Sequence, residues 1–152
     1  MPTLLVVDDS SVDRSFVGGL LAQEAGWSII YAAHGLAALK TLEHTIPDII
    51  VTDLLMPELD GLQLLTAVRK RYPLVPVILM TSHGSESIAL EAIRQGAASY
   101  VPKESIPRDL RETIHRLLAI SSCQRSHVWL LGRITRHQST FAWRTIGYCL
   151  RL

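Results

Sequence analysis

The sequence predicts an α/β domain, built as a doubly wound five-stranded parallel sheet with helices on both faces. Five short apolar runs recur over about the first hundred residues, and segments with helical spacing separate them. The runs are near-continuous rather than alternating, which is typical of parallel strands that are buried on both faces. Glycine and proline residues fall between the runs, where elements are expected to end.

Strand and helix segments alternate along the chain, beginning with a strand. The predicted strands are, in order, Thr3–Val7, Trp27–Ala32, Asp48–Thr52, Pro76–Met80 and Ser99–Val101. The helices predicted after them are Ser10–Glu24, Gly35–His44, Leu62–Arg71, Ser85–Gln95 and Ile106–Ile120. The unit therefore repeats five times, and right-handed crossovers between parallel strands place helices on both faces.

Local signals support these assignments. In the first helix, helical spacing predicts a buried side made of Val12, Phe16, Leu20 and Leu21. Gly96 directly follows the fourth helix, as is typical of a C-terminal glycine. Among the strand orders common in such sheets we adopt 2-1-3-4-5, which places the first and third strands side by side.

Length and charge divide the chain into two parts. Its 152 residues suit one domain, expected over residues 1–120, and a C-terminal extension of residues 121–152. All 14 acidic residues lie at or before Glu112, whereas the part from Thr113 onward has six arginines and no acidic residue. Both cysteines lie in the extension without a disulfide framework, and no secretory signal or membrane-spanning run is visible, so we expect a cytoplasmic protein.

Polar side chains collect at the ends of four predicted strands. Asp8 and Asp9 follow the first strand, Asp53 the third, Thr81 the fourth, and Lys103 the fifth. In open α/β sheets, ligands bind beyond the carboxyl ends of the strands where the strand order reverses. Each residue has an ordinary alternative as a cap, loop or solvated side chain. Their coincidence at four strand ends instead predicts one site.

Three carboxylates in one cleft repel one another, so they require a cation or raised pKa values. Mg²⁺ suits such a site because it prefers oxygen ligands and keeps waters or phosphate oxygens in its shell. One carboxylate can then attack phosphorus, and Lys103 and the Thr81 hydroxyl can bind the new phosphoryl oxygens.

Four segments resemble the signature of the receiver domain of two-component response regulators, including chemotaxis regulators with a flavodoxin-like fold. They are LLVVDDS (Leu4–Ser10), DIIVTDLLMPELDGLQLL (Asp48–Leu65), VILMTS (Val77–Ser82) and GAASYVPK (Gly96–Lys103). The resemblance implies a regulatory protein rather than an enzyme. Its Asp53 would accept a phosphoryl group from a sensor histidine kinase or a phosphotransfer protein.

The resemblance also implies roles for the other site residues. Asp8, Asp9, Asp53 and the main-chain carbonyl of Leu55 would hold Mg²⁺. Thr81 would be the switch hydroxyl, Lys103 the phosphate-pairing lysine, and Tyr100 the switch aromatic that moves inward. Leu55 and His83 occupy positions that influence phosphate loss in this family, and an apolar Leu55 predicts slower self-dephosphorylation than a polar residue would give.

Competing hypotheses remain open. A Mg²⁺-dependent phosphatase would use an acceptor near the first strand and a substrate cap, whereas here the central acceptor follows the third strand and no insertion is long enough for a cap. Two further hypotheses are a pseudo-receiver used only for binding and a regulator that lacks its output module. The basic, aromatic extension suits partner binding or dimerisation, or the start of a second module, better than nucleic-acid binding. A homodimer would form through the extension or the face of the fourth helix, fifth strand and fifth helix.

Overall fold

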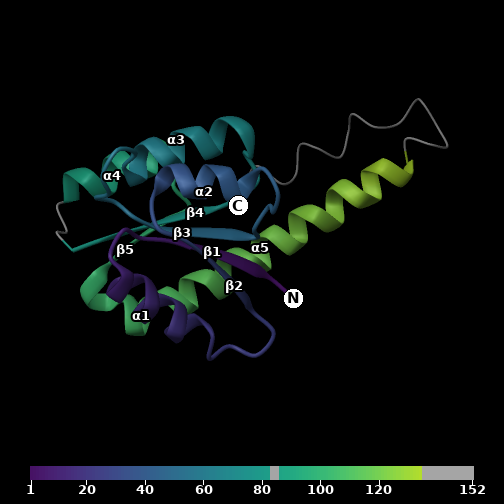
Figure 1. The fold of residues 1–152 in the computed structure, drawn as a ribbon. Coiled ribbons are helices and arrows are strands. Elements are labelled where there is room, and N and C mark those ends of the chain that lie inside the picture. Colours follow the sequence, from purple (N-terminus) through teal and green to yellow (C-terminus); the bar gives the residue numbers. More distant parts are fainter. Residues whose placement is uncertain (83–85, 135–152) are drawn as a thin grey trace. The chain divides into compact units, whose positions relative to one another are not determined.

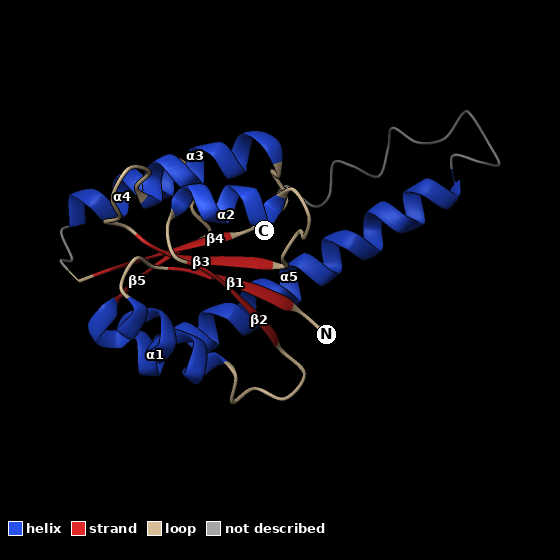
Figure 2. Cartoon of the chain, viewed as in Figure 1, coloured by secondary structure: helices blue, strands red, loops and turns tan. Residues whose placement is uncertain are grey.

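The sheet has five parallel strands in the order β2-β1-β3-β4-β5, as predicted (Figure 2). This computed structural model describes residues 1–82 and 86–134. The strands are β1 (Thr3–Val7), β2 (Ser28–Ala32), β3 (Ile49–Asp53), β4 (Val77–Thr81) and β5 (Ser99–Pro102). β1 and β3 are hydrogen-bonded neighbours, so the strand order reverses between them.

Helices cover both faces of the sheet. They are α1 (Ser11–Leu21), α2 (Gly35–Leu42), α3 (Gly61–Arg71), α4 (Glu86–Arg94) and α5 (Ile106–Ile134), with a 3-10 turn, η1 (Lys103–Ser105), before α5. In Figure 1, α2, α3 and α4 lie on one face, whereas α1 and the first part of α5 lie on the other. The doubly wound α/β class is therefore confirmed.

The core consists of two apolar layers, one on each face of the sheet. Alternate residues of every strand point to opposite faces, so Leu5, Ile50 and Leu79 join one layer while Leu4, Ile49 and Ile78 join the other. The first layer includes side chains of α2, α3 and α4, and the second includes side chains of α1 and α5. Burial on both faces explains why the strands appear as continuous apolar runs.

The predicted buried side of α1 is partly wrong. Val12 is 75% exposed and Phe16 is 53% exposed, while Val17 and Leu21 are the large side chains buried in this helix. Gly18 explains why the buried side differs from the predicted one, because the ring of Tyr31 occupies the space where a Cβ atom of residue 18 would lie. The helix therefore packs its Val17–Gly18–Leu21 side on the sheet, and the side with Val12 and Phe16 faces solvent.

The fifth helix is longer than predicted. It runs from Ile106 to Ile134 rather than ending at Ile120, so it continues into the part of the chain assigned to the extension. The chain divides into two compact units, Met1–Ala119 and Ile120–Leu152. Most of the aromatic residues of the extension, such as Phe141 and Trp143, lie outside the described residues. Within the described residues no helix combines the length and hydropathy that crossing a bilayer requires.

Candidate functional site

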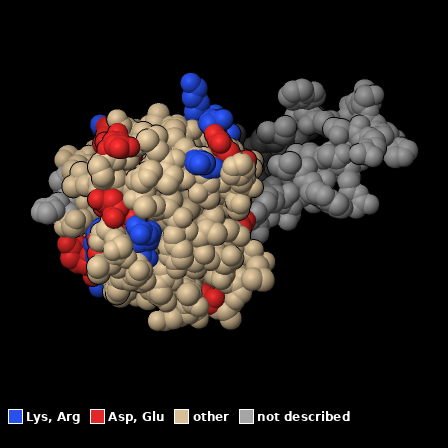
Figure 3. Space-filling model, viewed as in Figure 1, with Lys and Arg blue, Asp and Glu red and all other residues tan. Residues whose placement is uncertain are grey.

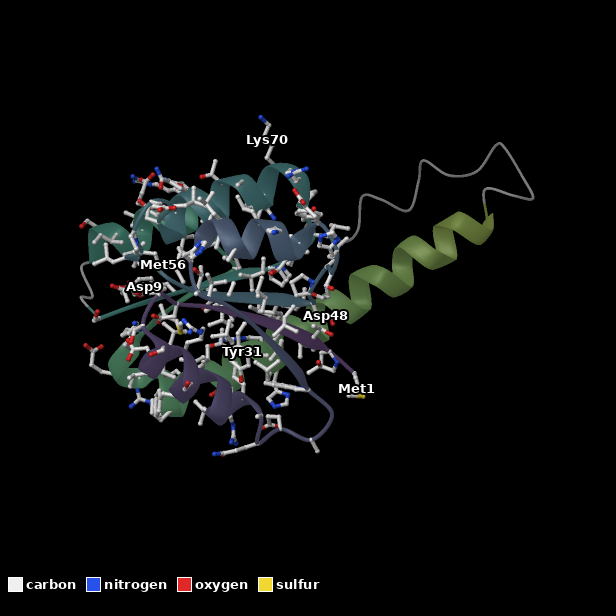
Figure 4. All side chains as sticks on the ribbon, viewed as in Figure 1. Met1, Asp9, Tyr31, Asp48, Met56 and Lys70 are labelled. Atoms are coloured by element: carbon white, nitrogen blue, oxygen red, sulfur yellow. The ribbon has the colours of Figure 1, made fainter. Side chains whose placement is uncertain are left out.

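The carboxyl ends of β1 and β3 bring three aspartates together. Asp8 and Asp9 directly follow β1, and Asp53 is the last residue of β3. One carboxylate oxygen from each residue lies within 4.8 Å of one from each of the others. Figure 4 shows Asp9 and Met56 at this end of the sheet, whereas Met1 and Asp48 lie at the opposite end.

Burial and backbone hydrogen bonds hold two of these carboxylates in place. Asp8 and Asp53 are buried, whereas Asp9 is exposed. The N–H of Leu54 donates to Asp53 Oδ1 at 2.9 Å, and the N–H of Ser10 donates to Asp8 Oδ1 at 2.9 Å. The two side chains are therefore oriented before any ligand binds. In Figure 3, charged groups of both signs lie on the side of the viewed face where Figure 4 labels Asp9.

The loop between β3 and α3 packs closely against the backbone of Asp53. The N–H of Gly61 donates to the Leu54 carbonyl at 2.8 Å, and a Cβ atom at residue 61 would lie 2.4 Å from the Asp53 carbonyl oxygen. Only glycine permits this approach. Asp60 and Gln63 form a capping box that starts α3 at this point. The start of α3 is thereby fixed beside the acidic cluster.

Lys103 reaches the carboxylates from the end of β5. Its Nζ atom lies 3.1 Å from Asp8 Oδ2 and 3.5 Å from Asp53 Oδ1. It also lies 2.7 Å from Asp13 Oδ2. Asp13 was not among the site residues predicted from the sequence. The available signal was its place in the first turn of the helix that follows Asp9, because that turn stays beside the strand ends.

Burial and charge shift the ionisation of this cluster. Burial raises the pKa of the Asp8 and Asp53 carboxyls, and Lys103 opposes the rise in both. Burial alone would lower the pKa of Lys103, but hydrogen bonds to Asp13 and Asp8 and the charge of Asp53 raise it above the ordinary value. The lysine is therefore charged at neutral pH. The three carboxylates offer the hard oxygen donors that Mg²⁺ prefers, so the residues fit this ion.

Three other predicted site residues come from β4, β5 and the loop after β3. Thr81 is buried at the end of β4 and pairs in register with Pro102. Tyr100 packs against the core, and its hydroxyl is buried without a hydrogen-bond partner in the described part of the chain. The side chain of Leu55, two residues after Asp53, is 64% exposed, and His83 lies outside the described residues.

Comparison with known proteins agrees with this arrangement. The profile of the response regulator receiver domain matches residues 4–115. The DNA-binding transcriptional regulator NtrC of Escherichia coli (strain K12) is 38% identical over 109 residues, which cover 72% of this chain and 22% of NtrC. The response regulator protein FleR of Pseudomonas aeruginosa is 34% identical over 150 residues, which cover 90% of this chain and 31% of FleR. The chain thus spans less than a third of either relative.

Solved structures of related proteins also superpose on this chain. NtrX from Brucella abortus superposes with a TM-score of 0.78 at 31% identity, over 85% of this chain and 29% of NtrX. The chemotaxis protein CheY4 of Vibrio cholerae superposes with a TM-score of 0.71 at 32% identity, over 77% of this chain and 98% of CheY4. Together with the profile match over residues 4–115, these likenesses show that the chain belongs to the response regulator receiver domain family.

Proposed function

We propose that this chain is a phosphorylation-dependent signalling switch whose Asp53 accepts a phosphoryl group. A sensor histidine kinase or a phosphotransfer protein would supply the group from a phosphohistidine. The observation that carries the proposal is the position of Asp53 at a strand end, within 4.8 Å of two further carboxylates and 3.5 Å from a lysine. Membership of the family adds support, because its members are regulatory domains.

The chemistry assigned to the site needs few groups. The Asp53 carboxylate attacks phosphorus, the phosphorus–nitrogen bond of the donor breaks, and the electron pair stays on the donor imidazole. Asp8, Asp9 and Asp53, with the Leu55 carbonyl, would hold Mg²⁺, which supplies positive charge beside the phosphoryl oxygens. Lys103, already 3.5 Å from Asp53, stabilises the added negative charge, and the Thr81 hydroxyl donates to a phosphoryl oxygen.

The switch itself involves Thr81 and Tyr100. A phosphoryl group has more negative charge than a carboxylate and three strong acceptor oxygens, so it draws the Thr81 hydroxyl toward it. Tyr100 then changes its packing, and the surface of α4, β5 and α5 changes with it. The unpartnered hydroxyl of Tyr100 supports this role, because no described hydrogen bond holds the ring in its present position.

The proposal is tested by labelling the full chain with acetyl phosphate and Mg²⁺. We expect Asp53→Asn to abolish labelling, while Asp48→Asn, at the opposite end of β3, leaves it intact. Labelling of the Asp53→Asn chain at another residue would contradict the assignment. A pseudo-receiver predicts that even the unaltered chain shows no response to beryllium fluoride with Mg²⁺, whereas a working receiver predicts a response that Asp53→Asn removes.

We further propose that residues 1–120 form the switch and that residues 121–152 extend it, in a cytoplasmic protein. A homodimer through the face of α4, β5 and α5 is supported by two exposed apolar side chains of α4, Leu90 and Ile93. Between β5 and α5 lies a polar pocket with charges of both signs, from Asp109, Glu112 and Arg116. Because this chain spans 22% of NtrC, the DNA binding in that protein's name is not carried over.

The dimer proposal has its own test. The average molecular mass in solution should approach that of two chains, and activation of the switch with beryllium fluoride should bring it closer to that value. If removal of residues 121–152 abolishes the dimer, the extension rather than the α4, β5 and α5 face is the interface. A monomeric full chain under both conditions contradicts both arrangements.

A further inference from the structure

Lys103 directs its hydrogen bonds away from the proposed acceptor. Among the described residues, its Nζ atom donates to Asp13 Oδ2 at 2.7 Å and to Asp8 Oδ2 at 3.1 Å. The nearest oxygen of Asp53 is farther away, at 3.5 Å. An ammonium group has three N–H donors, so two of them are engaged by carboxylates that receive no phosphate. The shortest of the three contacts is the one to Asp13.

The start of α1 explains why Asp13 is available to Lys103. Asp13 is the third residue of this helix, where an acidic side chain often reaches back to the N–H of the capping residue. Here the N–H of the capping residue Ser10 donates to Asp8 Oδ1 instead. The Ser10 hydroxyl oxygen accepts from the N–H of Asp13, so capping does not use the Asp13 carboxylate. That carboxylate is left to bind the lysine.

We propose that Asp13 is a positioning residue that competes with the phosphoryl group for Lys103. This inference rests on the proposed function of Asp53. The phosphoryl group would present three acceptor oxygens and additional negative charge, both of which attract the lysine. Full engagement of Lys103 with these oxygens requires its contact with Asp13 to lengthen, because the ammonium group now lies closer to Asp13 than to Asp53.

The negative charge of Asp13 also opposes the binding of a phosphoryl group. It adds a fourth carboxylate, which contacts the same lysine as Asp8 and Asp53, and this negative charge disfavours an anion at the site and favours a cation. By holding Lys103, it also keeps this competing positive charge nearer to α1 than to the acceptor. Asp13 should therefore weaken the binding of a phosphoryl group and strengthen the binding of Mg²⁺. A residue that only supported the fold would affect both ligands in the same direction.

Solvent exposure limits the size of the effect. The side chain of Asp13 is 45% exposed and that of Lys103 is 17% exposed, so water screens part of their attraction. Ion pairs of this kind change an equilibrium constant by about two- to fivefold. An effect of this size is measurable, and the opposite signs for the two ligands make it distinctive.

The test compares the full chain with its Asp13→Asn variant by titration calorimetry. We expect Asp13→Asn to bind beryllium fluoride, at saturating Mg²⁺, about two- to fivefold more tightly. The same variant should bind Mg²⁺ alone about two- to fivefold more weakly. Asp48→Asn is the control, because Asp48 directly precedes β3 and lies at the end of the sheet opposite to the acidic cluster. It should leave both affinities unchanged.

Tighter binding of beryllium fluoride together with weaker binding of Mg²⁺ by Asp13→Asn supports the proposed role of Asp13. Unchanged or weaker binding of beryllium fluoride by Asp13→Asn overturns the inference while leaving the proposed function intact. Weaker binding of both ligands with a lower melting temperature also overturns it, because that result assigns Asp13 a supporting role in the fold. If the unaltered chain does not respond to beryllium fluoride with Mg²⁺, the proposed function fails and this inference fails with it.

Discussion

Replacing Asp53 with asparagine should stabilise the folded protein at neutral pH, although the side chain is buried and hydrogen-bonded. The reason is electrostatic. Oxygens of Asp8 and Asp9 lie within 4.8 Å of the Asp53 carboxylate, and Lys103 lies 3.5 Å from it. At an effective dielectric constant of about 20, each repulsion is about 3.5 kcal/mol and the attraction to Lys103 is about 4.7 kcal/mol.

Two repulsions therefore exceed the one attraction by about 2 kcal/mol, and screening at the exposed Asp9 reduces this to about 1 to 2 kcal/mol. Burial disfavours the charged form of Asp53 as well, which acts in the same direction. The amide oxygen of asparagine can still accept the hydrogen bond from the Leu54 N–H. We expect the free energy of unfolding of Asp53→Asn at pH 7 to rise by about 1 to 2 kcal/mol.

The pH dependence gives a second measurement. The pKa of Asp53 is raised in the folded state above its ordinary value of 3.8, so the folded protein holds its proton more tightly. The unaltered protein therefore loses stability as pH rises from the ordinary pKa through the folded one. The stability gain of Asp53→Asn should be present at pH 7 and shrink as pH falls toward the ordinary pKa.

Urea denaturation across this pH range, without divalent cations, measures both effects. Asp109→Asn is the control. The neighbouring Arg108 lowers the pKa of Asp109, so removal of the Asp109 charge should bring no gain in stability. Saturating Mg²⁺ should stabilise the unaltered protein more than Asp53→Asn, which reduces the difference. An Asp53→Asn variant that is less stable at pH 7, or a stability gain that persists unchanged in acid, would show that repulsion among the carboxylates does not destabilise the folded protein.

Three further substitutions test other parts of the site, and Gly19→Ala is the control for one of them, Gly61→Ala. Tyr100→Phe removes a buried hydroxyl without a described partner, so the free energy of unfolding should rise by about 1 kcal/mol in urea denaturation; a loss of stability would reveal a partner. Gly61→Ala places a Cβ atom 2.4 Å from the Asp53 carbonyl oxygen and should cost about 2 to 4 kcal/mol. Gly19→Ala, with open space around it, should be neutral or stabilising by about 0.5 to 1 kcal/mol. Leu55→Asn supplies a polar group beside Asp53 that can orient water, so decay of the labelled protein, followed by mass spectrometry, should be faster; equal or slower decay contradicts this role.

Local sequence information was sufficient to predict the strands and most residues of the candidate site. Each strand is buried on both faces, so its residues are apolar whatever the neighbouring elements are, and the run is visible without a structure. The residues at the strand ends can likewise be identified from the nearby sequence. Asp8, Asp9 and Asp53 were therefore predicted as one cluster, and their oxygens do lie together. Their functional roles stay predictions.

The side of α1 that packs on the sheet was decided by tertiary structure. Helical periodicity allows one stripe through Val12 and Phe16 and another through Val17 and Leu21. The second is buried because Gly18 leaves room for the ring of Tyr31, a residue of another element. The length of α5 was only partly predictable from the sequence. No glycine or proline lies between Pro107 and Gly132, so the sequence permits a long helix without requiring one.

Three carboxylates, a hydroxyl and a lysine were predicted at four strand ends without a structure, because the order of elements along the chain assigns each residue to a strand end. The way in which Lys103 divides its hydrogen bonds among the carboxylates depends on the packing of distant elements. A lysine side chain is long and flexible, and Asp13 lies on a helix about ninety residues earlier in the chain. Their contact depends on how α1 begins and how β5 ends, and no local pattern of residues specifies both.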